Sequence, residues 1–241
     1  MCAQAHVQTR PNISKVDFAK YFDHTLLVPT ATVIDIDRVC DEAVRNGFYS
    51  VCIPPWHVRH AAKRLKGSGV KVCSVVGFPL GFTFDRVKLA EAEEEIGAGA
   101  DEVDMVMNVS AFKSEDYESV SNEIEEIAEF CHSCNRLLKV IIECCYLTDE
   151  EKVRASQLAE RAGADFVKTS TGLGPSGATA KDVALIKRSL KGATRVKAAG
   201  GIRTLDDALG MIIAGADRIG SSSGVKIMAQ WNEQAEKAGP S

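Results

Sequence analysis

Two lysines stand on short apolar segments in the second half of the chain. Lys168 closes the segment 166–168, and Lys197 lies within 195–198, which is the next predicted strand. If both ammonium groups enter the same interior, repulsion and burial would lower at least one lysine pKa. A neutral lysine amine attacks carbonyl carbons, so the pattern favours Schiff-base chemistry. The alternative is that each lysine extends to solvent or pairs with a carboxylate.

A carboxylate on another predicted strand could partner these lysines. Asp104 lies in the segment 102–106, where strand alternation places Glu102 and Asp104 on the same face. A group of two lysines and one aspartate could hold charge and transfer protons during a reaction. The same residues could instead form a structural ion pair, and Glu102 could be the active carboxylate in place of Asp104.

Two glycine-rich segments could bind an anion. The segments 200–204 (GGIRT) and 220–224 (GSSSG) each follow a predicted strand and open a helix. Glycines let the backbone approach an anion, and a helix N-terminus offers free N–H groups, so we predict a phosphate site here. The alternative is a pair of tight turns with serine caps. The segment 169–172 (TSTG), directly after Lys168, adds hydroxyls that could bind substrate or cap the next helix.

The other reactive residue types form no recognisable centre. Cys131 and Cys134 make one C-x-x-C inside a predicted helix, and no second pair completes a zinc site, so no metal is predicted. Cys52 lies near a strand end with nothing nearby expected to lower its pKa. His24 follows Asp23 on a predicted strand and is expected to point away from the face of Asp23, in a structural role.

The elements that must position these residues alternate regularly along the chain. Apolar runs rich in Val and Ile alternate with segments of helical period, as in βα units around a parallel sheet. The predicted strands are 23–26, 50–53, 71–76, 102–107, 138–142, 166–168, 195–198 and 218–220. The predicted helices are 32–46, 56–65, 84–96, 117–134, 149–162, 180–190, 205–214 and one after 220.

Eight such strands fit a closed (β/α)₈ barrel, the TIM barrel of the α/β class. A Gly-Ala-Asp triplet precedes three of the strands, at 99–101, 163–165 and 215–217, which indicates one repeated loop design. The first strand, 23–26, is the weakest, and without it seven strands would favour an open sheet. In a barrel, catalytic groups lie at the carboxyl ends of the strands and in the loops that follow.

Composition is that of an ordinary globular protein. The chain has 241 residues, of which 45% are hydrophobic and 26% charged, and we predict one domain over 1–241 with 1–15 as a flexible N-terminal extension. A formal charge of −4 without blocks of like charge indicates no nucleic-acid or anionic membrane partner. The longest run without charged residues or histidine, 72–84, is shorter than the ~20 residues of a spanning helix.

The first residues carry no apolar signal segment, and we expect a cytoplasmic chain whose eight cysteines are reduced.

From about Asp17 to Ile227 the sequence resembles the deoxyribose-phosphate aldolases. The matching motifs are Asp23-His24-Thr25-Leu26-Leu27, Val75-Val76-Gly77-Phe78-Pro79, Glu102-Val103-Asp104, Val167-Lys168-Thr169-Ser170-Thr171-Gly172, Lys197-Ala198-Ala199-Gly200-Gly201-Ile202-Arg203-Thr204 and Gly220-Ser221-Ser222.

The resemblance implies a metal-free, cofactor-free class I aldolase with a (β/α)₈ fold. Members reversibly cleave 2-deoxy-D-ribose 5-phosphate into acetaldehyde and glyceraldehyde 3-phosphate in deoxynucleoside catabolism. By motif, Lys168 would form the Schiff base, Lys197 would tune its pKa, and Asp104 would donate and accept protons. The resemblance also implies a phosphate cradle and, from family habit, a homodimer. The implied cradle residues are Gly172, Gly200, Gly201, Ser222 and Ser223.

The sequence departs from the family pattern at three places. Leu173 and Val28 stand where related sequences often carry a lysine, so phosphate binding would depend more on backbone N–H groups. The end of the chain, 239–241, has no terminal tyrosine of the kind that some members use in proton transfer. These departures bear on turnover rate more than on reaction type.

Three other functions fit parts of the same pattern. Another Schiff-base aldolase would share Lys168 and act on a different sugar phosphate. A phosphosugar-binding barrel without turnover would use the lysines only to neutralise an anion. A phosphosugar isomerase would need Glu102 or Asp104 and could dispense with Lys168.

Overall fold

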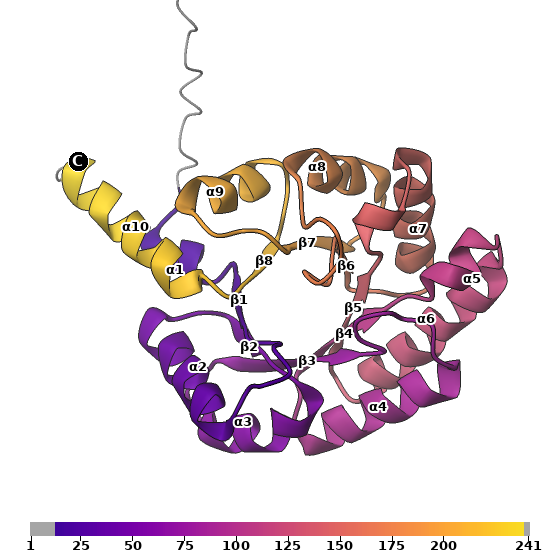
Figure 1. Ribbon diagram of the computed structural model, residues 1–241, viewed down its shortest axis with the longest axis horizontal. Coiled ribbons are helices and arrows are strands. Elements are labelled where there is room, and N and C mark those ends of the chain that lie inside the picture. Colours follow the sequence, from indigo (N-terminus) through magenta and orange to yellow (C-terminus); the bar gives the residue numbers. More distant parts are fainter. Residues whose placement is uncertain (1–12, 239–241) are drawn as a thin grey trace, which may run out of the picture.

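Eight parallel strands form a closed barrel in the computed structural model, which describes residues 13–238 (Figure 1). Each strand pairs with the next in sequence, and the last pairs with the first. The predicted (β/α)₈ architecture is confirmed, including its weakest strand, the first. The strands are β1 (Phe22–Thr25), β2 (Ser50–Cys52), β3 (Lys71–Val76), β4 (Glu102–Val106), β5 (Leu137–Ile141), β6 (Phe166–Lys168), β7 (Arg195–Ala199) and β8 (Arg218–Ser221).

Helices surround the barrel (Figure 1). The long ones fall where helical period predicted them. The helices are α1 (Lys15–Ala19), α2 (Val33–Asn46), α3 (Val58–Arg64), α4 (Asp85–Ala98), α5 (Val109–Lys113), α6 (Tyr117–Ser133), α7 (Asp149–Arg161), α8 (Ala180–Ser189), α9 (Leu205–Ile213) and α10 (Gly224–Ala238), with 3₁₀ turns η1 (Pro55–His57) and η2 (Cys144–Tyr146). Two five-residue helices, α1 and α5, were not predicted, because so short a segment shows no clear period.

The three Gly-Ala-Asp triplets share one geometry. Their glycines have positive φ angles and close the turn after a helix. Each aspartate then accepts a hydrogen bond from a backbone N–H of the preceding strand: Asp101 from Val72, Asp165 from Leu138 and Asp217 from Val196. The repeat therefore joins the beginnings of neighbouring strands at the amino end of the barrel.

The barrel separates an apolar layer from a polar interior. Outward-facing strand residues such as Val103, Met105 and Val140 are buried against the helices in the main hydrophobic cluster. Inward-facing positions carry charge instead, because alternation turns Asp104 and Lys139 to the other face. The strand register then places charged residues beside one another across four strands: Asp104 pairs with Lys139, and Lys168 pairs with Lys197.

Two sequence predictions concern the ends of the chain. Residues 1–12, most of the predicted flexible extension, and residues 239–241, which carry no tyrosine, lie outside the described residues. Ile13 packs against the core, and the Ser14 side chain caps α1. Within 13–238, no helix combines the length and apolar character needed to span a membrane.

Candidate active site

Asp104 lies at the centre of three lysines inside the barrel. Its Oδ2 atom is 2.8 Å from Lys168 Nζ and 2.7 Å from Lys197 Nζ. Its Oδ1 atom is 2.8 Å from the Nζ atom of Lys139. All four side chains are buried. The structure thus brings together the two lysines and the aspartate that the sequence singled out, and it adds a third lysine.

Two more carboxylates and an arginine complete this charged group. Glu102 is 2.7 Å from Lys139 and 3.2 Å from Arg218. Asp23 is 2.7 Å from Arg218 and also contacts Lys197. The group therefore holds three lysines and an arginine against three carboxylates, so its positive charges are nearly balanced.

Sequence reasoning missed Lys139 and Arg218. It searched the carboxyl ends of the strands, whereas Lys139 lies in the middle of β5 and Arg218 opens β8. Both residues could have been found from the sequence, because each is a charged residue at an inward position of an apolar strand. Lys139 shows the same pattern as Lys197.

The pKa values of Lys197 and Lys139 are raised in the folded barrel, so a fall in lysine pKa is not found at Lys197. Burial alone would lower the pKa of Lys197, but the carboxylates of Asp104 and Asp23 outweigh burial and raise it. Burial and the carboxylates act on Lys139 in the same way, and its pKa also rises. The sequence argument for Lys168 and Lys197 counted only like charges and burial, and it did not count the carboxylates that lie between the lysines.

Asp104 shows the complementary effect. Burial alone would raise the pKa of its carboxyl group, but the charges of Lys139, Lys168 and Lys197 hold that pKa well below its usual range. With no substrate bound, Asp104 is therefore a carboxylate.

Lys168 differs from the other two lysines in what surrounds it. Its ammonium contacts one carboxylate, that of Asp104, whereas Lys197 and Lys139 each contact two within 3 Å. Lys168 also lines a cavity of about 270 Å³ at the carboxyl ends of the strands. Among the three lysines, it is the one placed to meet a molecule that enters the barrel.

The glycine-rich loops form the wall of this cavity. Gly172, Gly200, Gly201 and Ser222 line it, whereas Ser223 does not. Gly200 has a φ angle of 87°, and a Cβ atom there would lie 3.0 Å from Gly177 and 3.1 Å from Gly172. Glycine at this position allows two loops to touch through their backbones. The backbone N–H of Ser223 instead donates to Ser221 Oγ.

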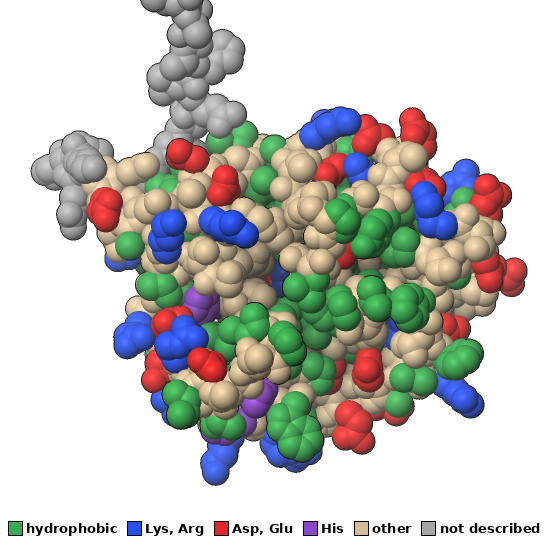
Figure 2. All heavy atoms as spheres, viewed as in Figure 1, with side chains coloured by type: hydrophobic (Ala, Val, Ile, Leu, Met, Phe, Trp, Pro, Cys, Tyr) green, Lys and Arg blue, Asp and Glu red, His purple; other side chains and the backbone are tan. Residues whose placement is uncertain are grey.

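Apolar residues also line the cavity. Val28 and Leu173, at the two positions where related sequences often carry a lysine, both face it and are 49% and 63% exposed. Arg203 lines the cavity as well, and sequence reasoning quoted its motif without assigning it a role. Hydrophobic side chains gather near the centre of the face in Figure 2, with charges of both signs around its edge.

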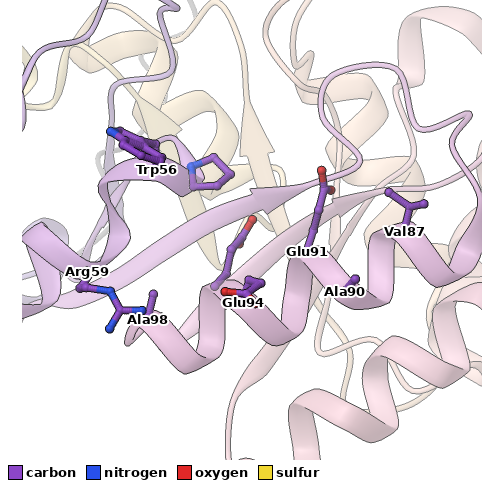
Figure 3. Close-up of a pocket in the computed structure, with 9 residues that line it drawn as sticks. Trp56, Arg59, Val87, Ala90, Glu91, Glu94 and Ala98 are labelled. Carbon is purple, nitrogen blue, oxygen red and sulfur yellow. The ribbon is translucent and has the colours of Figure 1, made fainter.

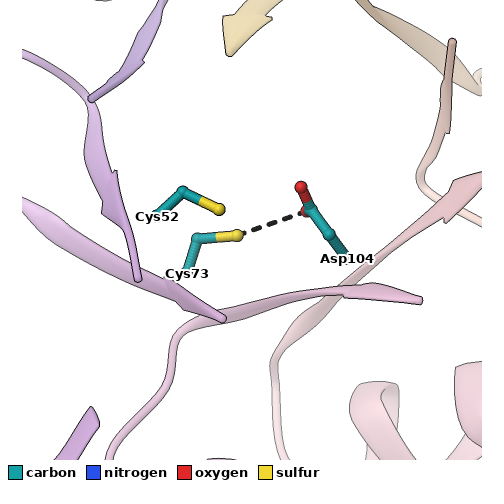
Figure 4. Close-up of side chains that lie close together, drawn as sticks. All are labelled: Cys52, Cys73 and Asp104. Atoms are coloured by element: carbon teal, nitrogen blue, oxygen red, sulfur yellow. Dashed lines mark hydrogen bonds between the residues drawn. The ribbon is translucent and has the colours of Figure 1, made fainter. Parts of the chain in front are cut away.

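Two cysteines adjoin the charged group (Figure 4). Cys73 donates a hydrogen bond to Asp104 at 3.2 Å and lies beside Cys52, its register partner on β2. The expectation that nothing lowers the pKa of Cys52 is wrong, because a hydrogen bond with Cys73 lowers it despite burial. The sulfurs and an Asp104 oxygen lie within 4.8 Å of one another, as metal ligands would. The three ammonium groups around Asp104 disfavour a cation there.

His24 lies on the outer side of the barrel. Its Nε2 atom is 2.7 Å from a carboxylate oxygen of Glu42 on α2, and its ring packs beside Phe48. This contact joins β1 to α2, which agrees with the predicted structural role.

A larger cavity lies outside the barrel. It measures about 660 Å³ and is bounded by the η1 turn, α3 and α4, with Trp56, Arg59 and Glu91 among its lining residues (Figure 3). None of the residues predicted to be catalytic or substrate-binding lines it. The smaller cavity beside Lys168 is therefore the candidate active site.

Comparison with known proteins decides which family this site belongs to. The sequence model of the DeoC/LacD family aldolases matches residues 18–230. The chain belongs to this aldolase family. The resemblance seen in the sequence is confirmed, and the protein is an aldolase of the lyase class.

Curated relatives agree with this assignment. A deoxyribose-phosphate aldolase from Thermococcus gammatolerans is 54% identical over 88% of this chain and 96% of the relative. One from a Thermoanaerobacter species is 53% identical over 90% of this chain and 98% of the relative. This aldolase therefore matches its relatives over nearly their whole length.

Solved structures share the fold. A protein described as QR15, an aldolase, is 45% identical with a TM-score of 0.86, and the match covers 92% of this chain and 98% of the other. A tetrameric deoxyribose phosphate aldolase from Aeropyrum pernix is 36% identical with a TM-score of 0.85, covering 92% and 93%.

Proposed function

We propose that this aldolase is a deoxyribose-phosphate aldolase that uses Lys168 as its Schiff-base residue. It reversibly cleaves 2-deoxy-D-ribose 5-phosphate to acetaldehyde and D-glyceraldehyde 3-phosphate. The observation that carries the role of Lys168 is its position: it faces the cavity, while Lys197 and Lys139 are held by pairs of carboxylates. The named relatives support the choice of sugar.

The first step is attack by the Lys168 amine on the aldehyde carbon of the open-chain sugar. Asp104 Oδ2, 2.8 Å from Nζ, is placed to take the ammonium proton that must leave before attack. Loss of water then gives a protonated imine, which draws electrons from the neighbouring carbon–carbon bond. Lysine itself supplies the electron sink, so the reaction needs no metal and no cofactor.

Cleavage breaks the bond between C2 and C3 of the sugar. A base removes the proton of the C3 hydroxyl, the C3 aldehyde leaves as glyceraldehyde 3-phosphate, and an enamine remains on Lys168. A proton returns to C2, and water releases acetaldehyde from the imine. Asp104 is the proton acceptor and donor in these steps, and Lys197, which stays charged, fixes the orientation of the Asp104 carboxylate.

The glycine-rich wall of the cavity holds the 5-phosphate. Gly172, Gly200, Gly201 and Ser222 offer backbone N–H groups, and Ser223 stands beside them at the start of α10. Arg203 supplies positive charge at the cavity, whereas Val28 and Leu173 supply none. Phosphate affinity therefore depends on the backbone and Arg203 together.

The proposed activity also indicates where the enzyme acts in metabolism and in the cell. The substrate arises in the breakdown of deoxynucleosides, and we infer a cytoplasmic enzyme whose partner is a small phosphorylated sugar. The seven described cysteines are unpaired, as expected in a reducing compartment. A homodimer remains our proposal for the assembly, and the Aeropyrum pernix relative shows that a tetramer also occurs in the family.

A product assay tests the proposed function. We expect the protein to release acetaldehyde from 2-deoxyribose 5-phosphate, and to release far less from ribose 5-phosphate or unphosphorylated 2-deoxyribose. Lys168→Ala should abolish release while its circular dichroism spectrum stays that of the wild type. Efficient cleavage of another sugar phosphate, with none of 2-deoxyribose 5-phosphate, would show that the substrate is wrong.

A further inference from the structure

Glu143 stands in a backbone conformation that glutamate rarely adopts. It lies two residues after the end of β5 and has a φ angle of 51°, in the left-handed region that favours glycine. Its side chain is buried, with 3% of its surface exposed. A strained residue of this kind persists only where its surroundings hold it, and such residues cluster at functional sites.

The carboxylate of Glu143 holds the loop that follows Lys168. Its Oε2 atom accepts hydrogen bonds from the backbone N–H of Thr171 at 3.1 Å and from the Thr171 hydroxyl at 2.5 Å. The same hydroxyl oxygen accepts a bond from the backbone N–H of Leu173 at 3.1 Å. One carboxylate therefore fixes the residues on both sides of Gly172.

This loop is part of the wall of the Lys168 cavity. Thr171, Gly172 and Leu173 all line it. Gly172 in turn packs closely on Gly200, and a Cβ atom on Gly172 would lie 3.5 Å from the Gly200 Cα atom. By holding Thr171, the Glu143 carboxylate therefore fixes the backbone at Gly172, to which we assign phosphate binding.

The loop also rests directly on the turn that carries Glu143. A Cβ atom on Gly174 would lie 2.9 Å from Cys145 Sγ and 3.4 Å from Glu143 Cδ, so glycine is needed for this approach. The backbone N–H of Cys144 donates a hydrogen bond of 2.8 Å to the Thr169 carbonyl, which also joins the Glu143 turn to the loop after β6. Glu143 is therefore held in its strained conformation by the loop that it supports.

We propose that Glu143 is a positioning residue of the aldolase site, which sets the 171–173 loop for binding the substrate phosphate. This inference rests on the proposed function. It assigns no proton transfer to Glu143, because the carboxylate touches Thr171 and does not line the Lys168 cavity. Its loss should weaken phosphate binding and leave the chemistry at Lys168 intact.

The test compares two substitutions at this position. Glu143→Gly removes the carboxylate and keeps a residue that tolerates a positive φ angle. Glu143→Gln keeps an acceptor for the Thr171 N–H. We expect KM for 2-deoxyribose 5-phosphate to rise ~10- to 100-fold in Glu143→Gly, the size expected when a buried charge-assisted hydrogen bond is lost. Glu143→Gln should restore part of this loss.

A second readout separates positioning from general damage. Acetaldehyde carries no phosphate, so borohydride trapping of acetaldehyde on Lys168 should proceed within about twofold of the wild-type rate in Glu143→Gly. Glu160→Gln is the matched control, because Glu160 also holds a loop through the backbone N–H groups of Lys191 and Gly192, at the opposite end of the barrel. It should leave KM unchanged.

An unchanged KM in folded Glu143→Gly would overturn the inference. So would an equal loss of phosphate binding and of acetaldehyde trapping, which would indicate a structural role alone. If wild-type protein traps no acetaldehyde, the proposed function itself fails, and that outcome is visible before any variant is made.

Discussion

At the scale of single residues, the site depends on one carboxylate shared by three lysines. Asp104 is buried, stays ionised and contacts all three Nζ atoms. Removing one partner from such a group leaves buried charge without compensation, which costs more than the pair itself contributes. Asp104 is therefore expected to matter for both stability and turnover.

Asp104→Asn tests both roles. We expect kcat to fall by at least about 100-fold, since the side chain can no longer accept or return a proton. We also expect the free energy of unfolding to fall by ~3–5 kcal/mol, because three ammonium groups lose their shared partner. Urea denaturation and the product assay measure the two effects. Wild-type turnover in this variant would favour Glu102 as the active carboxylate.

The main residues of the candidate site could be predicted from the sequence alone. Lys168, Lys197 and Asp104 stand out because charge on an apolar strand is unusual, and their meeting follows from barrel closure. Their charge states could not be predicted in the same way. Lysine pKa values depend on Asp23 and Glu102, whose distances from Lys197 and Lys139 exist only in the folded barrel.

At the scale of elements, short turns position the strands and loops of the barrel. The Gly-Ala-Asp turns tie the strands together at the amino end of the barrel, and the glycine contacts bring the loops together at the carboxyl end. Sequence predicted the turns from their repetition. It could not predict that Glu143, a residue with no preference for positive φ, would adopt the conformation of a glycine, because the loop after β6 imposes it.

Gly200→Ala tests the contact between loops. Alanine at a φ angle of 87° is strained, and its Cβ atom would push against Gly177 and Gly172. We expect KM for the phosphorylated sugar to rise at least about tenfold, equivalent to ~1.4 kcal/mol of lost binding. Steady-state kinetics measures this effect. Gly210→Ala is the control, because a Cβ atom at this α9 glycine meets nothing within 4 Å. An unchanged KM in Gly200→Ala would argue against a phosphate site at this loop.

At the scale of the whole molecule, barrel closure brings the first and last strands together at one site. Asp23 on β1 and Arg218 on β8 are 195 positions apart and form a buried ion pair.

Outside the barrel, the larger cavity beside α3 and α4 contains a buried acid that the proposed reaction does not use. Glu95 is 3% exposed, and among residues 13–238 neither of its carboxyl oxygens accepts a hydrogen bond of good geometry, since the nearby Ser74 hydroxyl donates to the Ile53 carbonyl instead. Burial raises its pKa to about 9 from 4.5.

This acid should make stability depend on pH. Between pH 4.5 and about 9 the folded protein keeps the Glu95 proton and the unfolded chain releases it, so stability falls as pH rises through this range. Glu95→Gln removes the dependence. We expect the variant to be ~1–3 kcal/mol more stable than wild type at pH 8 and nearly equal to it at pH 4.5. Urea denaturation at the two pH values measures the difference in free energy of unfolding between the variant and wild type. An equal difference at both pH values would show that Glu95 does not cause the pH dependence.

The role of Lys168 as the Schiff-base residue is tested by trapping the reaction intermediate. Wild-type protein is incubated with 2-deoxyribose 5-phosphate and borohydride, and the adduct is located by peptide mass, with Lys168→Ala, Lys197→Ala and Lys139→Ala beside it. We expect a stable adduct on Lys168 that disappears only when Lys168 itself is replaced or when a variant no longer folds. An adduct on Lys197 or Lys139, or none at all with bound substrate, would contradict this role.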